Sequence, residues 1–301
     1  MINLKNFDVI IVGGSYAGLS AAMSLGRAIR NVLIIDGGKP CNAQTPHSHN
    51  FITHDGVAPA AITESAKQQV LAYPTVQLIT DSVTSVTGAN NHFEVFTEQG
   101  EKFSAKKIIF TTGLKDIMPN IPGLPESWGI SVIHCPYCHG YEYKDKITGI
   151  LINGEHAFEF GRLIRNWTSH LSIFTNGKPT FDQEISLKIA SMGIKIVETE
   201  LENIEHENGH IRNLHFKDGM RVQLDALYAR LPFEQHCKIP EILGCKINNA
   251  GHIVVDNLQK TNIPGIYAAG DCATPMRSVS LAVAEGNKAG AFVNHELISE
   301  S

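Results

Sequence analysis

The cysteine pair in Cys135-Pro-Tyr-Cys138-His139 is the part of the sequence best suited to chemistry. Two cysteines with this spacing can attach haem, serve as the dithiol of a glutaredoxin, bind zinc together with further ligands, or form a thiol–disulfide couple. Haem attachment of this kind belongs to exported proteins, the glutaredoxin motif opens a small N-terminal domain, and a structural zinc site normally has a second ligand pair. The mid-chain position therefore favours a redox couple, and we expect no metal site.

The N-terminal segment predicts the strand, turn and helix of a dinucleotide-binding unit. An apolar strand at Asp8–Val12 is followed by the turn Gly13–Gly18 and by helical composition over Leu19–Arg30. Glycines in such a turn let the backbone approach a pyrophosphate, which then lies at the helix N-terminus. A second strand ends at Asp36, 23 residues after the first glycine, where an acid accepts hydrogen bonds from ribose hydroxyls. Ser15 replaces the middle glycine of the pattern and is small enough for the backbone to pass.

Two further elements indicate which dinucleotide this is. Thr111-Thr112-Gly113 ends a predicted strand, and Gly265-Ile-Tyr-Ala-Ala-Gly-Asp271 forms a strand and glycine turn near the C-terminus. An acid in the position of Asp271 can hold the ribityl hydroxyls of a flavin. Each element alone is a weak signal, but the two together, in this order after the first turn, predict FAD.

A second unit of the same kind follows the cysteine pair. Its predicted elements are a strand at Ile147–Asn153, a helix at Ala157–Trp167 and a strand at Leu171–Phe174, with strands at Lys195–Val197 and Ile211–Phe216 as a meander. The turn has the β-branched Ile152 in place of the first glycine. The following strand ends in Thr175-Asn-Gly177, without the arginines that hold NADPH or the carboxylate that holds NADH. We therefore expect a scaffold that no longer binds a nicotinamide nucleotide.

These patterns predict an α/β protein with two Rossmann-like, three-layer dinucleotide-binding domains on parallel sheets, the second inserted into the first. Pro/Gly-rich segments at residues 119–125 and 240–244 mark the expected linkers. We expect an FAD-binding domain over residues 1–115 and 245–301. The inserted NAD(P)-type domain, residues 116–244, would carry the cysteine pair.

The composition excludes several classes of protein. The 301 residues are 43% hydrophobic and 18% charged, as in an ordinary folded protein. With 25 Lys and Arg against 30 Asp and Glu, the chain has no basic surplus for nucleic acid or an anionic membrane surface. No apolar run approaches the ~20 residues of a spanning helix. The N-terminus lacks a signal-peptide pattern, so we expect a cytoplasmic protein that binds neither nucleic acid nor membrane.

The sequence resembles the thioredoxin-reductase-like flavoproteins, which are disulfide oxidoreductases with two dinucleotide-binding domains, over nearly the whole chain from Asp8 to Leu297. The motifs that carry the resemblance are Gly13–Gly18, Asp36-Gly-Gly38, Thr111–Gly113, Cys135-Pro-Tyr-Cys138, Tyr267–Asp271 and Arg277-Ser-Val279. More closely, His47-Ser-His-Asn50 and Cys138-His-Gly-Tyr-Glu142 resemble the dithiol (sulfhydryl) oxidase branch, which closes disulfides in small thiol natural products. The resemblance implies a homodimer with FAD in the outer domain and a redox disulfide in the inserted one.

The resemblance also implies roles for individual residues. Cys138 would lie against the isoalloxazine as the charge-transfer thiolate, and Cys135 would exchange with the substrate. His139 stands where thioredoxin reductases carry an acidic proton donor, and His134 is a second candidate for proton transfer or a neighbour that stabilises the thiolate. For His47 and His49, polar capping of their own loop is an equal alternative to flavin contact. The residues expected to contact FAD are Gly13, Gly14, Ser15, Tyr16, Ala17, Asp36, Gly37, Gly38, Lys39, Asn42, His49, Asn50, Val83, Thr112, Gly113, Gly270, Asp271, Arg277, Ser278 and Val279.

We hypothesise an FAD-dependent thiol–disulfide oxidoreductase that passes electrons from a dithiol through Cys135 and Cys138 to FAD, and then to dioxygen or another acceptor. Its partner would be a small-molecule dithiol or disulfide, or a thioredoxin-like protein. One alternative is an NAD(P)H-dependent thioredoxin reductase with a degenerate second turn. Another is a flavin-binding scaffold without catalysis, against which the intact cysteine pair argues.

Overall fold

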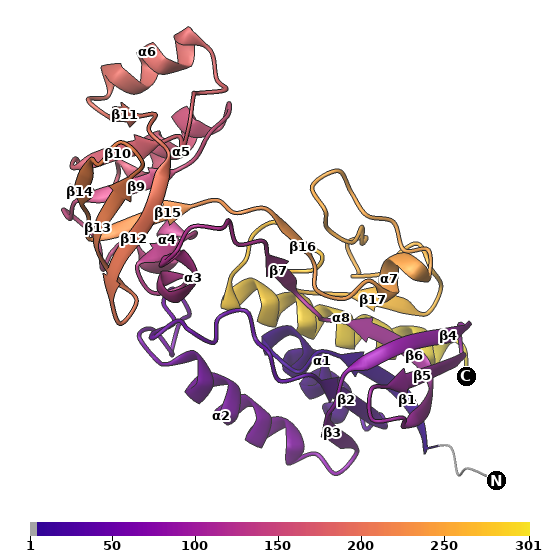
Figure 1. The fold of residues 1–301 in the computed structure, drawn as a ribbon. Coiled ribbons are helices and arrows are strands. Elements are labelled where there is room, and N and C mark those ends of the chain that lie inside the picture. Colours follow the sequence, from indigo (N-terminus) through magenta and orange to yellow (C-terminus); the bar gives the residue numbers. More distant parts are fainter. Residues whose placement is uncertain (1–4) are drawn as a thin grey trace. The chain divides into compact units, whose positions relative to one another are not determined.

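The computed structural model describes residues 5–301 and divides into two compact units (Figure 1). The first unit comprises the chain up to Ala43, Pro59–Lys115 and Phe233–Ser301. The second comprises Gln44–Ala58 and Asp116–Pro232. The long segment of the second unit therefore lies between two segments of the first.

The chain returns to the first unit at Pro232–Phe233, before the predicted position at residues 244–245. Pro240 and Gly244, which we interpreted as a linker, instead mark the ends of the short helix α7 (Ile239–Ile242). Proline occupies its first turn, and Gly244 follows it with a φ of +87°. Ile239 is buried in the core of the first unit, which explains why this segment belongs there.

A seven-stranded sheet forms the centre of the first unit. Its strands are β1 (Lys5–Val12), β2 (Val32–Asp36), β3 (Val76–Thr80), β4 (Val83–Ala89), β5 (His92–Thr97), β6 (Lys102–Phe110) and β17 (Ile266–Ala268). The order is β3-β2-β1-β6-β5-β4, with β17 also paired to β6. β1, β2, β3, β6 and β17 pair in parallel, whereas β4 and β5 form an antiparallel extension. Residues 9–12 are buried throughout, as expected of a parallel strand covered on both faces.

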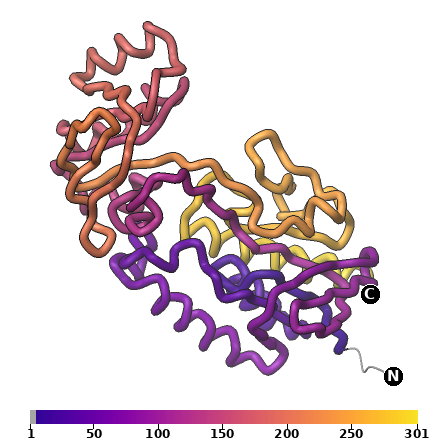
Figure 2. Tube along the Cα trace, viewed as in Figure 1, coloured from indigo at the N-terminus to yellow at the C-terminus, as the bar shows by residue number. Residues whose placement is uncertain are grey.

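Two helices of the first unit, α1 (Tyr16–Arg27) and α8 (Val279–Ser299), pack side by side, and their traces run together in Figure 2. Their close approach depends on glycine: a Cβ on Gly286 would lie 2.1 Å from the carbonyl oxygen of Ala17. Neither α8 nor any other helix within residues 5–301 combines the length and apolarity needed to cross a bilayer. The unit also contains α2 (Pro59–Leu71) and β16 (Phe233–Gln235), which pairs with β7 (Leu114–Asp116) where the chain leaves the unit.

The second unit has its own parallel sheet, with strand order β11-β10-β9-β15-β8, and a separate antiparallel sheet, β12-β13-β14. Its elements are α3 (Leu124–Ser127), β8 (Val132–Ile133), α4 (Pro136–His139), β9 (Thr148–Leu151), α5 (Ala157–Ile164), β10 (Leu171–Phe174), α6 (Gln183–Ser191), β11 (Lys195–Val197), β12 (Leu201–Glu207), β13 (His210–Phe216), β14 (Arg221–Gln223) and β15 (Ala226–Ala229). The predicted meander of Lys195–Val197 with Ile211–Phe216 is wrong. Helix α6, which we did not predict, provides the crossover that makes β11 parallel to β10.

Candidate active site

The turn between β1 and α1, together with the first turn of α1, holds three glycines at which a Cβ would clash. A Cβ on Gly13, whose φ is +105°, would lie 2.5 Å from the carbonyl oxygen of Thr111. A Cβ on Gly18 would lie 2.0 Å from the carbonyl oxygen of Gly13, and one on Gly14 would meet the Asp36 side chain at 2.8 Å. The turn is thus packed against the neighbouring strand ends and leads into a 12-residue helix, which is the geometry that holds a pyrophosphate.

The other predicted FAD residues of the first unit follow the ends of neighbouring strands or begin helices. Asp36 ends β2, Thr112 and Gly113 follow β6, and Gly270 and Asp271 follow β17, so all lie at the carboxyl edge where this fold binds ligands. Three of the remaining positions, Ser15, Tyr16 and Ala17, lie at the start of α1, and Asn42 donates to the Tyr16 hydroxyl at 3.4 Å. Three more, Gly37, Gly38 and Lys39, are exposed after β2. The others are Val83 at the start of β4 and Arg277, Ser278 and Val279 at the start of α8.

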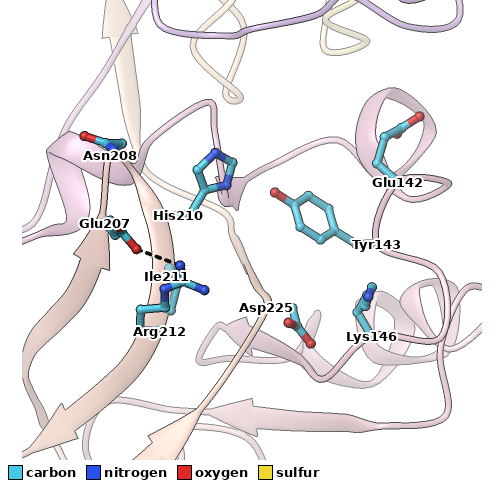
Figure 3. A pocket seen from close by; sticks show the side chains of 9 residues that line it. All are labelled: Glu142, Tyr143, Lys146, Glu207, Asn208, His210, Ile211, Arg212 and Asp225. Carbon is cyan, nitrogen blue, oxygen red and sulfur yellow. Dashed lines mark hydrogen bonds and ion pairs between the residues drawn. The ribbon is translucent and has the colours of Figure 1, made fainter.

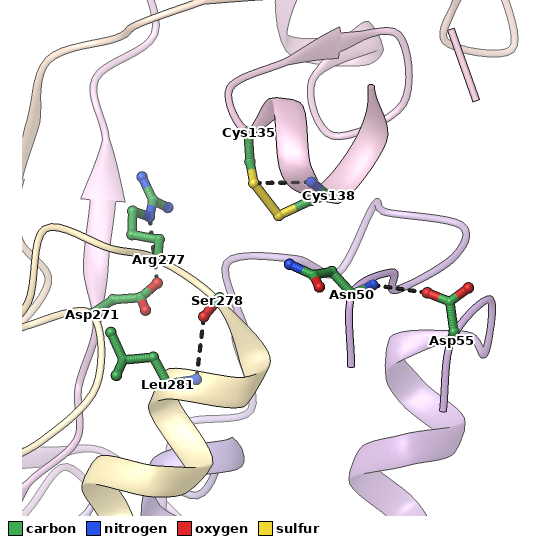
Figure 4. Close-up of a disulfide and its surroundings, with 8 residues drawn as sticks. All are labelled: Asn50, Asp55, Cys135, Cys138, Asp271, Arg277, Ser278 and Leu281. Carbon is green, nitrogen blue, oxygen red and sulfur yellow. Dashed lines mark hydrogen bonds and ion pairs between the residues drawn. A yellow bond between two sulfur atoms is a disulfide. The ribbon is translucent and has the colours of Figure 1, made fainter. Parts of the chain in front are cut away.

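These residues fit FAD. The Thr112 hydroxyl is buried and has no hydrogen-bond partner within the described chain, which suits a group that meets a cofactor. Asp271 Oδ2 accepts from Arg277 Nε at 3.4 Å, so the carboxylate expected to meet the ribityl chain is oriented by the segment that leads into α8 (Figure 4). Glu285, which sequence reasoning missed, accepts the Gly270 N–H at 2.8 Å and fixes the turn after β17.

Cys135 and Cys138 form a disulfide at the start of α4, with their Cα atoms 5.3 Å apart (Figure 4). Cys135 is the N-cap residue, and its Sγ accepts the backbone N–H of Cys138 at 3.1 Å. Tyr137, between the two cysteines, is 61% exposed. The pair is therefore held by one short helical turn in the second unit and is able to cycle between disulfide and dithiol.

The two histidines beside the cysteines differ in environment. His139 is half-buried, and burial, followed by the nearby charge of His49, lowers its pKa to about 4. The resemblance places His139 where thioredoxin reductases carry a proton donor, but with this lowered pKa its imidazole is neutral at pH 7. His134 stacks on Trp128, with ring centroids 5.8 Å apart.

The loop Gln44–Ala58, which we predicted within the FAD-binding domain, groups with the second unit. Its His49 lies between two carboxylates: Nδ1 is 3.5 Å from Asp55 Oδ1, and Nε2 is 3.6 Å from Glu142 Oε1. Asp55 Oδ1 also accepts the backbone N–H of Asn50 at 2.8 Å (Figure 4). The structure thus brings His49 together with the segment that follows the disulfide, and sequence reasoning missed both carboxylate partners. The position of Glu142, four residues after Cys138, is the sequence feature that could have indicated an acidic partner near the disulfide.

The turn after β9 differs from the turn after β1 in its hydrogen bonding. Asn153 Oδ1 accepts the N–H groups of Gly154 at 2.9 Å and Thr180 at 2.8 Å, while its Nδ2 donates to the carbonyls of Thr175 and Lys178. The N–H of Gly154 is therefore hydrogen-bonded within the chain. Helix α5 begins at Ala157, five residues after Ile152, whereas α1 begins at Tyr16, three residues after Gly13, the glycine that Ile152 replaces in the pattern.

The end of the next strand is likewise satisfied internally. Thr175 Oγ1 donates to the carbonyl of Gly177 at 2.6 Å, and Asn176 Oδ1 accepts the N–H of Leu201 at 2.7 Å. No arginine or carboxylate stands in this segment, 175–177. Sequence alone did not indicate the hydrogen bonds of Asn153 and Asn176.

A hollow of about 390 Å³ in the second unit carries no redox group (Figure 3). It is lined by Glu142, Tyr143, Lys146, Glu207, Asn208, His210, Ile211, Arg212 and Asp225. Arg212 and Glu207 pair at 2.7 Å, and Tyr143 donates to the carbonyl of Ile130 at 2.9 Å. Burial raises the pKa of Tyr143 to about 12, so its phenol stays protonated. We assign this hollow no part in the reaction.

A dinucleotide-binding turn that fits FAD, together with a redox-active disulfide on an inserted unit, defines a flavin-dependent disulfide oxidoreductase. The chain belongs to the pyridine nucleotide-disulphide oxidoreductase family, whose sequence model matches residues 7–286. FAD is its cofactor, and within the family it is thioredoxin-reductase-like.

Individual relatives match over almost the full chain. A solved oxidoreductase from Agrobacterium tumefaciens is 36% identical with a TM-score of 0.92, covering 98% of this chain and 100% of its own. A putative thioredoxin reductase, TrxB, from Bacillus anthracis is 30% identical with a TM-score of 0.93, covering 98% and 99%. Thioredoxin reductase sirT of Leptosphaeria maculans is 29% identical, covering 97% of this chain and 94% of its own length. This chain is thus similar to proteins of both bacteria and fungi.

Proposed function

We propose that this enzyme oxidises a small dithiol to its disulfide, with dioxygen as the terminal acceptor and without a nicotinamide nucleotide. The observation that carries the proposal is the bonding of the second turn, where Asn153 occupies the N–H of Gly154 that a pyrophosphate would need. Ile152, in place of a turn glycine, and the uncharged strand end at 175–177 support it. Two lost contacts, worth ~1.5–3 kcal/mol each for bonds to a charged group, weaken binding by roughly 10²–10⁴.

The chemistry balances with the residues at hand. A substrate thiol attacks Cys135 Sγ, the bond between Cys135 and Cys138 breaks, and Cys138 leaves as a thiolate. The second substrate thiol attacks the mixed disulfide, releasing the substrate disulfide and the Cys135 thiol. When bound, FAD supplies a two-electron exchange with the reduced pair and with dioxygen, which becomes hydrogen peroxide. Dithiol and dioxygen thus give disulfide and hydrogen peroxide.

His139 is suited to take the thiol proton in the first of these steps. It follows Cys138 directly, and burial keeps its imidazole neutral at physiological pH. A neutral imidazole accepts a proton from the attacking thiol as the new sulfur–sulfur bond forms. His134, stacked on Trp128, is then a neighbour of the disulfide rather than the acceptor.

Anaerobic stopped-flow mixing tests the proposal. We expect dithiothreitol to bleach the flavin and NADPH or NADH to leave it nearly unchanged. Admission of air should then yield one hydrogen peroxide per disulfide formed. Rapid, saturable reduction by micromolar NADPH would overturn the proposal and favour an NAD(P)H-dependent thioredoxin reductase. Flavin that neither donor reduces would instead point to a non-catalytic scaffold.

The homodimer and the cytoplasmic location implied by the resemblance and by the N-terminal sequence stay predictions. Light scattering of the purified holoenzyme should give about twice the mass of one chain. Fractionation of the source cells should recover the protein with the cytosol.

A further inference from the structure

The second unit contains a groove of about 660 Å³ at the place where this kind of fold binds ligands. In its parallel sheet, β9 and β15 are neighbours, and the order of strands reverses between them. Open α/β sheets bind ligands outside the carboxyl ends of the strands at such a switch point. Arg230 directly follows β15, and its guanidinium lies 5.7 Å from the ring centre of Phe160 on α5. An arginine thus lines the groove beside this switch point.

The groove offers aromatic walls and one uncompensated cation. Tyr137 and Trp167 meet edge to face at 5.6 Å, and both line the groove with Phe160. Arg162 is neutralised by Glu159 at 2.6 Å, whereas Arg230 is exposed and, among residues 5–301, has no carboxylate partner. Such a lining favours a ligand that has a planar ring and an anionic group.

The groove is also connected to the redox pair through Tyr137. This residue lies between Cys135 and Cys138, so a ligand held against its ring is carried by the same short helix as the disulfide. We propose that the groove binds the non-reacting part of the substrate, and that the substrate is a small dithiol bearing an aromatic ring and a carboxylate. This inference rests on the proposed dithiol oxidation and adds the chemical class of the substrate.

Binding is tested first without turnover. Isothermal titration of the oxidised holoenzyme with 2-naphthoate and with its neutral isostere 2-naphthamide should show tighter binding of the anion. Arg230→Gln should remove that preference, with a loss of about tenfold for one charge-assisted contact. Trp167→Phe should weaken both ligands. The control Arg221→Gln removes an arginine that pairs with Glu205 at 2.9 Å outside the groove, and it should bind both ligands as the unchanged protein does.

Turnover then tests the link to the reaction. Dihydrolipoate and dihydrolipoamide are dithiols that differ only in having a carboxylate or a carboxamide. Arg230→Gln should raise the KM for dihydrolipoate, relative to that for dihydrolipoamide, by about tenfold. Equal affinities for naphthoate and naphthamide, or affinities that Arg230→Gln does not change, would overturn the site. NADPH binding more tightly than naphthoate would assign the groove to a nucleotide instead. If neither dithiol is oxidised but the calorimetric preference holds, the proposed function fails while the site remains.

Discussion

At the scale of single residues, the proposal makes His139 the proton acceptor, and its pKa would then set how the first exchange step responds to pH. Its pKa is lowered by burial and by the charge of His49 to about 4, so the proton acceptor persists as pH falls through the range where an ordinary histidine becomes cationic. Between pH 7 and 5 the loss of substrate thiolate is then partly offset by general-base assistance.

We therefore predict a shallow pH dependence of dithiothreitol exchange between pH 5 and 7, with a steeper fall as pH approaches 4. In His139→Asn the rate should follow the thiolate concentration alone, about tenfold per pH unit below the thiol pKa. Stopped-flow rates at a series of pH values measure this, with His134→Asn as the matched control. Parallel profiles for His139→Asn and the unchanged protein would exclude His139 as the acceptor.

The roles of the two cysteines should be distinguishable by the absorption spectra of their serine variants. If Cys138 is the residue that meets the flavin, Cys135→Ser leaves a thiolate there and should show a long-wavelength charge-transfer band. Cys138→Ser should lack the band, and both variants should lose dithiol turnover. Absorption spectra of the purified variants above 500 nm suffice as the measurement; a band only in Cys138→Ser reverses the assignment.

Sequence reasoning succeeded for residues whose constraint is local. The glycines of the first turn follow from a steric requirement, and Cys135 and Cys138 from a fixed spacing. It did not find the bonding of Asn153, because three of the four partners of this side chain, Thr175, Lys178 and Thr180, lie more than 20 residues along the chain. The same holds for His49, whose partner Glu142 is brought to it by folding.

At the scale of elements, a buried ion cluster fixes α8 to the sheet of the first unit. Lys107 on β6 is fully buried, and its Nζ donates to Glu296 at 2.7 Å and to Glu300 at 2.6 Å. Burial alone would raise the pKa of Glu296, but hydrogen bonds from Lys107, Lys260 and Tyr267 outweigh it and lower the pKa to about 2. The stabilisation is complete above the unfolded-state pKa, near 4.5, and is lost as pH falls toward 2.

Lys107→Met should lower the free energy of unfolding by about 3–5 kcal/mol, because two carboxylates lose their buried counter-ion. The adjacent Lys106 is exposed and pairs with Asp8 at 2.9 Å, so Lys106→Met should cost less than about 1 kcal/mol. Urea unfolding at pH 7 compares the two. At pH 3 the gap between Lys107→Met and the unchanged protein should narrow. Equal costs for the two lysines would show that the cluster contributes no more than a surface pair.

At the scale of the whole molecule, the class of fold could be predicted but the borders of the units could not. Apolar strands, glycine turns and acids at strand ends recur at distances that only a dinucleotide-binding fold explains. Proline and glycine, however, occur in linkers and at helix ends alike. We therefore interpreted Pro240 and Gly244, which border α7, as the linker back to the first unit, whereas the chain re-enters that unit at Phe233. The two points where the chain passes between the units lie at the paired strands β7 and β16.

Each unit has its own hydrophobic core, and the predicted FAD residues lie in the first unit except for His49 and Asn50. Both tryptophans, Trp128 and Trp167, belong to the second unit. Their emission wavelength therefore reports the unfolding of that unit alone, while far-ultraviolet circular dichroism reports both. A ligand that binds only the folded first unit stabilises it by mass action.

We predict that FAD added to deflavinated protein at about 100 times its Kd stabilises the first unit by about 2.7 kcal/mol. For a domain of this size the dichroism transition should rise by roughly 5–10 °C. The tryptophan transition should stay nearly fixed, because the second unit holds its own core. Asp271→Ala should need a higher FAD concentration for the same shift, since it removes the carboxylate expected to hold the ribityl hydroxyls. Transitions that coincide and move together at every FAD concentration would mean that the two units unfold as one.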